Sequence, residues 1–182
     1  MKIFRANTAI LALALFAASC EVETPQRYFE VNGRKAKVNV AFMDTWGTSS
    51  DLKSRWYAIS FRSEEIEPEN YITFFISSFT NETDILAEGT YEYDYLGGTG
   101  FFSDLSLGYG IRYDYLGIPT GTRFDEDVAA FSGTITVERD RNNRYRFVFD
   151  IEADYDNSLY AITGEYNGTL VLNKNVVDLG TY

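Results

Sequence analysis

The alternation of apolar and polar residues along this chain is the feature that most limits its fold. Every second residue is apolar or small on both sides of the polar segment 140–143, namely Phe131, Gly133, Ile135 and Val137 before it and Tyr145, Phe147, Phe149 and Ile151 after it. Successive side chains of a β-strand point to opposite faces, so this pattern predicts an antiparallel hairpin with one face in a core. Intervening residues such as Thr134, Glu138 and Arg146 are then expected to face water.

A second hairpin is predicted around Asn32-Gly33. The alternating run Tyr28–Val31 precedes this dipeptide, and Val38, Val40 and Phe42 follow it. A type I′ turn needs positive φ at both central residues, which Asn and Gly adopt most readily. We therefore expect these two runs to pair with each other.

Further strands are predicted at short spacing, at residues 55–62, 71–79, 88–96, 107–116, 130–139, 144–153 and 159–172. The segment Tyr71–Phe79 is apolar on both faces, which favours a central strand covered on two sides. Aromatic residues make up 16% of the chain, as suits strands, and the single cysteine leaves no disulfide to stabilise them. The prediction is an all-β fold, a single antiparallel β-barrel of about eight to ten strands, with a β-sandwich as the alternative.

The N-terminus has the layout of a secretory signal peptide. Lys2 and Arg5 precede the apolar run Ala9–Ala18, which is shorter than the roughly 18 residues that span a bilayer. The predicted organisation is a signal peptide at 1–19, a polar tether at 20–26 and one β-domain at 27–182.

Cys20 directly follows the small residues Ala17-Ala18-Ser19. This arrangement resembles the lipobox of bacterial lipoproteins, which implies that Cys20 is cleaved free and acylated with chains such as palmitate. Two or three acyl chains hold a protein firmly on a membrane. The resemblance implies an outer-membrane lipid anchor in the cell envelope, facing the periplasm or the outside. Ordinary cleavage after Ser19, without lipid, is the alternative.

Charge and missing residue types exclude several classes of function. The net charge is −11, and it becomes −13 when residues 1–19 and their two cations are removed. Such an acidic chain is a poor ligand for nucleic acid. The chain contains no histidine, which removes Ser-His-Asp triads and most zinc sites. We therefore expect no enzyme and no cofactor.

Acidic residues offer the remaining site chemistry. Glu64-Glu65, Asp125–Asp127 and the alternate positions 150–156 are rich in carboxylates, which a solvated outer face explains most simply. Asp154, Asp156 and Asn157 form a candidate calcium site, because hard cations prefer oxygen ligands. A carboxylate-only glycosidase is the third possibility for the chain.

Aromatic residues give the candidate ligand site, made of Trp46, Trp56, Tyr95 and Tyr115. The two tryptophans flank the loop Gly47–Ser54, and core burial is the alternative for each. The sequence of Tyr93–Gly97 recurs at 113–117. That spacing fits one hairpin, so the two copies are expected at neighbouring strand ends. They would either share a strand-end geometry or form a rim that stacks on a sugar.

The C-terminal strands, with residues 131–137, 145–147 and 162–170, are similar to uncharacterised secreted lipoproteins of Gram-negative bacteria. The resemblance extends over roughly residues 85–172 and implies an antiparallel barrel or sandwich of calycin-like type. The Gly-x-Trp signature of lipocalins is absent, since Trp46-Gly47 has the reverse order. Glycines 133, 164 and 168 are expected at bends or close backbone approaches.

These observations together predict a lipid-anchored lipoprotein of the cell envelope. It would act as a non-catalytic binding or accessory module, for a glycan or another small molecule. The alternative is a structural partner subunit of an outer-membrane complex, bound through an envelope protein partner.

Overall fold

The computed structural model describes residues 26–48, 54–63, 68–80, 84–96, 98–114, 116, 118–124 and 130–173. The predicted signal peptide, Cys20 and all of the tether but Gln26 lie outside the described residues, as do Glu64-Glu65 and Asp125–Asp127. The described residues form strands, turns and connections and contain no helix, so the predicted all-β class is confirmed. Within this described part, nothing helical is long and apolar enough to cross a membrane.

One sheet contains all the strands. They are β1 Arg27–Val31, β2 Arg34–Lys37, β3 Val40–Thr48, β4 Arg55–Arg62, β5 Glu69–Ser78, β6 Gly89–Tyr93, β7 Phe101–Tyr113, β8 Pro119–Phe124, β9 Ala130–Arg139, β10 Tyr145–Tyr155, β11 Ser158–Gly168 and β12 Val171–Asn173. Their order is β12-β3-β4-β5-β7-β6-β9-β10-β11-β1-β2, and β8 pairs with β7 beside this path. The pairings are antiparallel except β12 with β3 and β6 with β7.

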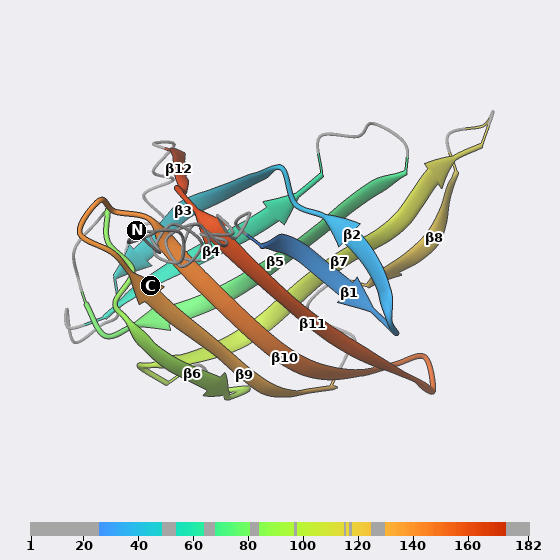
Figure 1. The fold of residues 1–182 in the computed structure, drawn as a ribbon. Helices are drawn as coiled ribbons and strands as arrows, with labels where there is room; N and C mark the ends of the chain where they lie inside the picture. The colour runs from blue at the N-terminus through green and yellow to red at the C-terminus, as the bar shows by residue number, and fades with distance from the viewer. Residues whose placement is uncertain are drawn as a thin grey trace, which may run out of the picture.

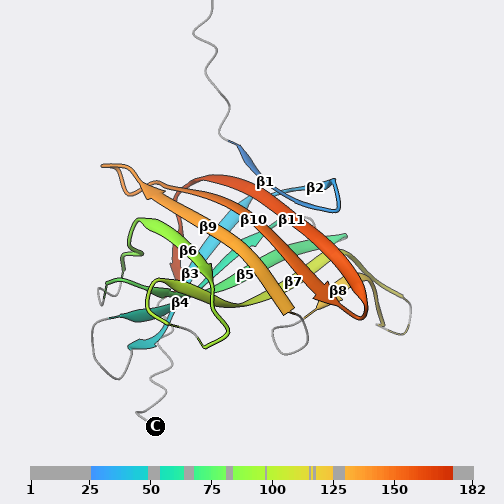
Figure 2. The same ribbon diagram turned by 90° about the horizontal axis from the view of Figure 1, so that it is seen from below.

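The sheet curls until its two halves lie face to face (Figures 1 and 2). One layer contains β3, β4, β5, β7 and β8, and the other contains β9, β10, β11, β1 and β2. Strand β6 joins the layers, pairing with β9 on one side and at two positions with β7 on the other. The path ends at β12 and β2 without a ladder between them in the described residues, so the sheet is a half-barrel. The described residues contribute twelve strands to it, more than the predicted eight to ten.

The short connection between β2 and β3 carries the chain from one layer to the other. The Val38 N–H donates to the carbonyl of Arg27 in β1 at 2.9 Å, and the Asn39 N–H donates to Arg62 in β4 at 2.9 Å. The predicted Asn32-Gly33 turn is confirmed, with φ of 50° and 76°. The expectation that the hairpin continues to Phe42 is wrong, because adjacent backbone groups at this corner bond to opposite layers.

Aromatic side chains fill the space between the layers. Phe61 of β4 lies with its ring centroid 6.0 Å from Phe74, 5.1 Å from Phe147, 6.1 Å from Phe149 and 5.1 Å from Tyr166. These neighbours belong to β5, β10 and β11, so both layers share one core. Gly164 permits this packing, since a Cβ there would meet the Phe149 ring at 2.2 Å. The predicted close approach at this glycine is confirmed.

The segment 84–88 closes one end of the interior. Leu86 is fully buried, and three tyrosine hydroxyls hold the backbone around it. The Tyr57 hydroxyl donates to the Ile85 carbonyl at 3.0 Å, the Tyr91 hydroxyl donates to Ala87 at 2.7 Å, and the Tyr145 hydroxyl accepts the Leu86 N–H at 3.3 Å. Burial raises the pKa of Tyr91 above its usual value. This end of the half-barrel is therefore occupied by the chain itself.

Some strand predictions coincide with the structure, and others do not. The predicted strands 55–62 and 130–139 are β4 and β9, and the turn between β9 and β10 is confirmed. There the Asp140 Oδ1 accepts the N–H of Asn142 at 2.8 Å and that of Arg144 at 2.9 Å. The sequence pattern does not predict β8, and it predicts β11 and β12 as one strand, residues 159–172, which the structure divides after Gly168.

Candidate functional site

A trough of about 430 Å³ lies on the outer face of the layer that contains β3, β4 and β5. Outward side chains of these strands line it, together with one residue each from β7 and β8. They are Asp44, Trp46, Ala58, Ser60, Arg62, Glu69, Tyr71, Thr73, Phe75, Ser106 and Arg123. This surface is the candidate functional site and is called the trough below.

Small side chains form the floor of the trough. In the register of the sheet, Ala58 of β4 lies between Asp44 of β3 and Phe75 of β5. Two positions further along β4, the Ser60 hydroxyl lies 2.9 Å from that of Thr73. Ala58 and Ser60 are only 4% and 5% exposed although they point outward, because taller neighbours surround them. The depression thus results from side-chain size.

Trp46 forms one wall. The register of β3 and β4 shifts between Thr45 and Gly47, so Trp46 is the extra residue of a β-bulge. Its ring lies edge-on to Phe75, with centroids 5.2 Å apart, and 49% of the residue is exposed. Trp46 is therefore a surface residue, not a core one. Trp56 points to the same outer face, opposite Gly47 and Ser77, but lies outside the trough lining.

Tyr71 and Arg62 form the other end. They are cross-strand neighbours, and Tyr71 in turn lies opposite Gly108 of β7. A Cβ on Gly108 would come within 2.3 Å of the Tyr71 ring, so the ring lies directly against this glycine. The Arg62 guanidinium lies 5.9 Å from the Tyr71 ring centroid and 6.0 Å from that of Phe42.

The two turns that carry the tyrosines of the predicted rim lie apart in the structure. Tyr95 is 80% exposed in the turn after β6, and Tyr115 lies outside the described residues. The two copies of the repeat do share a turn: Asp94 accepts the N–H groups of Leu96 and Gly98, and Asp114 accepts those of Leu116 and Ile118. These turns lie at opposite ends of the 13-residue strand β7 (Figure 1), about 40 Å apart at the usual rise. The expectation of neighbouring strand ends is wrong.

The residues proposed for calcium have another structural role. Asp154 is exposed on the outer face of β10. Asp156 and Asn157, with φ of 50° and 56°, are the central residues of the tight turn between Tyr155 and Ser158. In the described part of the chain, no group of three Asp, Glu, Cys or His residues is placed for a metal ion. Asp156 and Asn157 therefore have a structural role in this turn.

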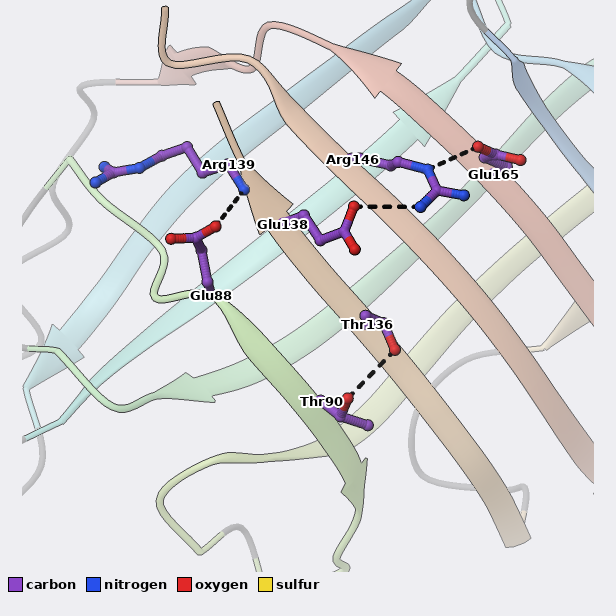
Figure 3. Close-up of polar contacts among 7 residues, drawn as sticks. All are labelled: Glu88, Thr90, Thr136, Glu138, Arg139, Arg146 and Glu165. Carbon is purple, nitrogen blue, oxygen red and sulfur yellow. Dashed lines mark hydrogen bonds and ion pairs between the residues drawn. The ribbon is translucent and has the colours of Figure 1, made fainter. Parts of the chain in front are cut away.

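The outer face of the other layer has a different chemistry (Figure 3). Arg146 of β10 binds Glu138 of β9 at 3.2 Å and Glu165 of β11 at 2.9 Å. Both carboxylates raise the pKa of Arg146, Glu165 more strongly. The Thr90 and Thr136 hydroxyls lie 3.4 Å apart, and the Arg139 N–H donates to Glu88. We call this surface the charged face.

Sequence reasoning found Trp46 but missed Tyr71, Phe75 and Arg62. Residues 71–79 are apolar on both faces of the predicted strand, and this pattern pointed to Tyr71 and Phe75. It was interpreted as a strand covered on both faces. Strand β5 is central in its layer, but the outward residues Tyr71, Thr73 and Phe75 are only partly buried and line the trough. No family model, curated protein or solved structure matches the chain significantly.

Proposed function

We propose that the protein is a lipid-anchored carbohydrate-binding module of the cell envelope, with the trough as its ligand site. The observation that supports this proposal is the half-exposed Trp46 beside a floor of small side chains, of which Ser60 and Thr73 carry hydroxyls. Binding sites typically combine aromatic surface with a few well-placed polar groups.

The trough offers both kinds of surface that a sugar presents. The C–H face of a sugar ring is apolar and packs on the flat rings of Trp46 or Tyr71. Ring hydroxyls are both donors and acceptors, and they match the Asp44 carboxylate and the Ser60 and Thr73 hydroxyls. Trp46 packs on Phe75, which is about 13 Å along β5 from Tyr71. The ligand is thus an extended chain of several sugar rings.

The carboxylates in the trough support binding without catalysis. Asp44 is level with Phe75 in the sheet register, and Phe75 is about 20 Å along β5 from Glu69. Glycosidases hold their two carboxyl groups roughly 5 to 9.5 Å apart. These two acids are too distant to act on one glycosidic bond.

The described part of the interior is largely occupied by side chains and by the chain itself. Aromatic rings fill it around Phe61, and the segment 84–88 occupies one end. We regard the half-barrel as a calycin-like frame that binds on its outer face, unlike the barrels that enclose a ligand.

The anchor is the second part of the proposal. Residues 20–26, fully extended, reach at most about 25 Å, so a lipid on Cys20 keeps β1 near the membrane. In the full chain expressed in a Gram-negative host, Cys20→Ser should move the protein from the membrane fraction to the soluble fraction. An unchanged membrane fraction would overturn the anchor.

A glycan array tests the binding function. The full chain, purified in detergent, should bind one class of glycan on the array. Trp46→Ala should weaken that binding at least tenfold. Tyr95→Ala is the matched control, because Tyr95 is an exposed aromatic residue outside the trough. Thermal unfolding of each variant shows that the fold is kept. Retention of no glycan, or equal losses in both variants, would overturn the proposal.

A further inference from the structure

One row of residues crosses four strands at the Tyr71 end of the trough. Arg62 of β4 pairs with Tyr71 of β5, Tyr71 pairs with Gly108 of β7, and Gly108 pairs with Arg123 of β8. Three strand spacings separate the two arginines, about 14 Å in all. The row therefore places one aromatic ring between two cationic residues.

Gly108 determines how close the Tyr71 ring lies to the sheet. With no side chain on β7 at this position, Tyr71 lies against the neighbouring strand, where a Cβ would be 2.8 Å from its Cδ1 and Cζ atoms. A ring that lies over the sheet gives the trough a flat surface. This geometry suits stacking with the face of another ring.

Arg62 lies beside this surface at cation–π distance from two rings. Its guanidinium lies within about 6 Å of two ring centroids, those of Phe42 and Tyr71. Among the described residues the Arg62 side chain forms no ion pair, whereas Glu69 and Arg123 already interact with other groups. A cation–π contact does not use the N–H donors at the guanidinium edge, which form the planar fork that matches a carboxylate.

The two ends of the trough thus differ in charge. Arg62 is level with Tyr71, and Asp44 is level with Phe75, about 13 Å away along the strand. The Asp44 end suits neutral sugar hydroxyls, and the Tyr71 end, where Arg62 and Arg123 outnumber Glu69, suits an anionic substituent. The net charge of −13 that remains without residues 1–19 does not prevent this, since physiological salt screens charges beyond about 8 Å.

We infer that the trough selects an acidic saccharide, a glycan with a uronic acid, and that Arg62 binds its carboxylate while the same sugar ring stacks on Tyr71. This inference rests on the proposed carbohydrate-binding function. It adds the substrate class and the residue that determines it.

Trigalacturonate and its methyl ester test the inference, because they share their sugar rings and differ in charge. Calorimetry with the full chain in detergent should show the acid binding at least tenfold more tightly than the ester. Arg62→Ala should remove this preference, and Arg62→Lys should restore only part of it, since an ammonium lacks the planar fork. Gly108→Ala should weaken both ligands, because it displaces the Tyr71 ring.

Arg141→Ala is the control for charge, since Arg141 is exposed in the turn before β10 and its loss changes the net charge equally. An unchanged preference in this variant is expected. If acid and ester bind equally and both need Trp46, the carbohydrate function stands and the selection of acidic sugars is wrong. A preference that survives Arg62→Ala would also overturn it. If neither compound nor any glycan on the array binds, both the carbohydrate-binding function and the selection of acidic sugars are wrong.

Discussion

The trough and the charged face lie on opposite outer surfaces of one curled sheet and cover the same core. On the charged face, side chains of similar length stand on neighbouring strands and bind one another, as Arg146 does with Glu138 and Glu165. In the trough, small residues such as Ala58 and Ser60 alternate across strands with large aromatic ones. Differences in side-chain size produce a depression, and equal sizes produce an even surface.

The two arginines show the same contrast. On the charged face, the donors of Arg146 are used by two carboxylates from adjacent strands. In the trough, the guanidinium of Arg62 lies within about 6 Å of two aromatic ring centroids and forms no ion pair with another described residue, and we propose that its donors bind a ligand. A polar residue on the outside of a sheet is thus a candidate for ligand binding when its neighbours contact it but leave its hydrogen-bond donors unused.

The largest expected effect comes from the core that both faces share. Phe61→Ala should lower the free energy of unfolding by about 3–5 kcal/mol, since it leaves a cavity among four aromatic rings of both layers. Urea unfolding followed by tyrosine and tryptophan fluorescence measures this. If Phe61→Ala lowered the free energy of unfolding by less than about 1 kcal/mol, the two layers would be stabilised separately.

A larger side chain on the floor of the trough should weaken glycan binding, whereas the same addition on the other layer should not. Ala58→Leu places a branched side chain between Asp44 and Phe75 and should weaken glycan binding at least tenfold, about 1.4 kcal/mol. Thr134→Leu makes a similar addition on the layer of the charged face and should leave binding unchanged. The glycan array used for Trp46→Ala measures both, and equal effects would remove the distinction between the faces.

On the charged face, Arg146→Ala should lower the free energy of unfolding by less than about 1 kcal/mol, because exposed ion pairs contribute little. High salt should reduce this small difference further. Chemical unfolding at low and high salt measures it, with glycan binding as the second readout. A change in binding would contradict a purely structural role for this face.

The smallest effect is expected at the turn before β10. The Arg144 N–H, together with that of Asn142, holds the pKa of Asp140 below its usual range. A lowered folded-state pKa stabilises the fold above the unfolded value of about 3.9, and this contribution is lost as the pH falls through the folded pKa. Asp140→Asn should therefore be slightly less stable than wild type at pH 7, with the difference vanishing in acid. Thermal unfolding over a series of pH values measures this. A stability difference between wild type and Asp140→Asn that increases in acid would contradict the prediction.

Local chemistry made parts of the fold predictable from sequence. The Asn32-Gly33 and Asp140–Asn143 turns were identified correctly, because positive φ and side-chain acceptors for backbone N–H groups are properties of a few consecutive residues. The inward aromatic residues of β9 and β10 were identified for the same reason, since alternation fixes which face is buried. The strand exchange at Val38 was not predictable, because it depends on two distant partners, Arg27 and Arg62.

The candidate site divides in the same way. The sequence by itself determined that this chain forms strands, where two tight turns lie, and that Trp46 is a candidate for a ligand site. Only the tertiary structure decided that Arg62, Tyr71 and Gly108 form one row and that Tyr95 lies far from the second repeat. The physical reason is that side-chain direction within a strand is local, whereas the neighbours across strands are set by pairing between segments distant in the chain.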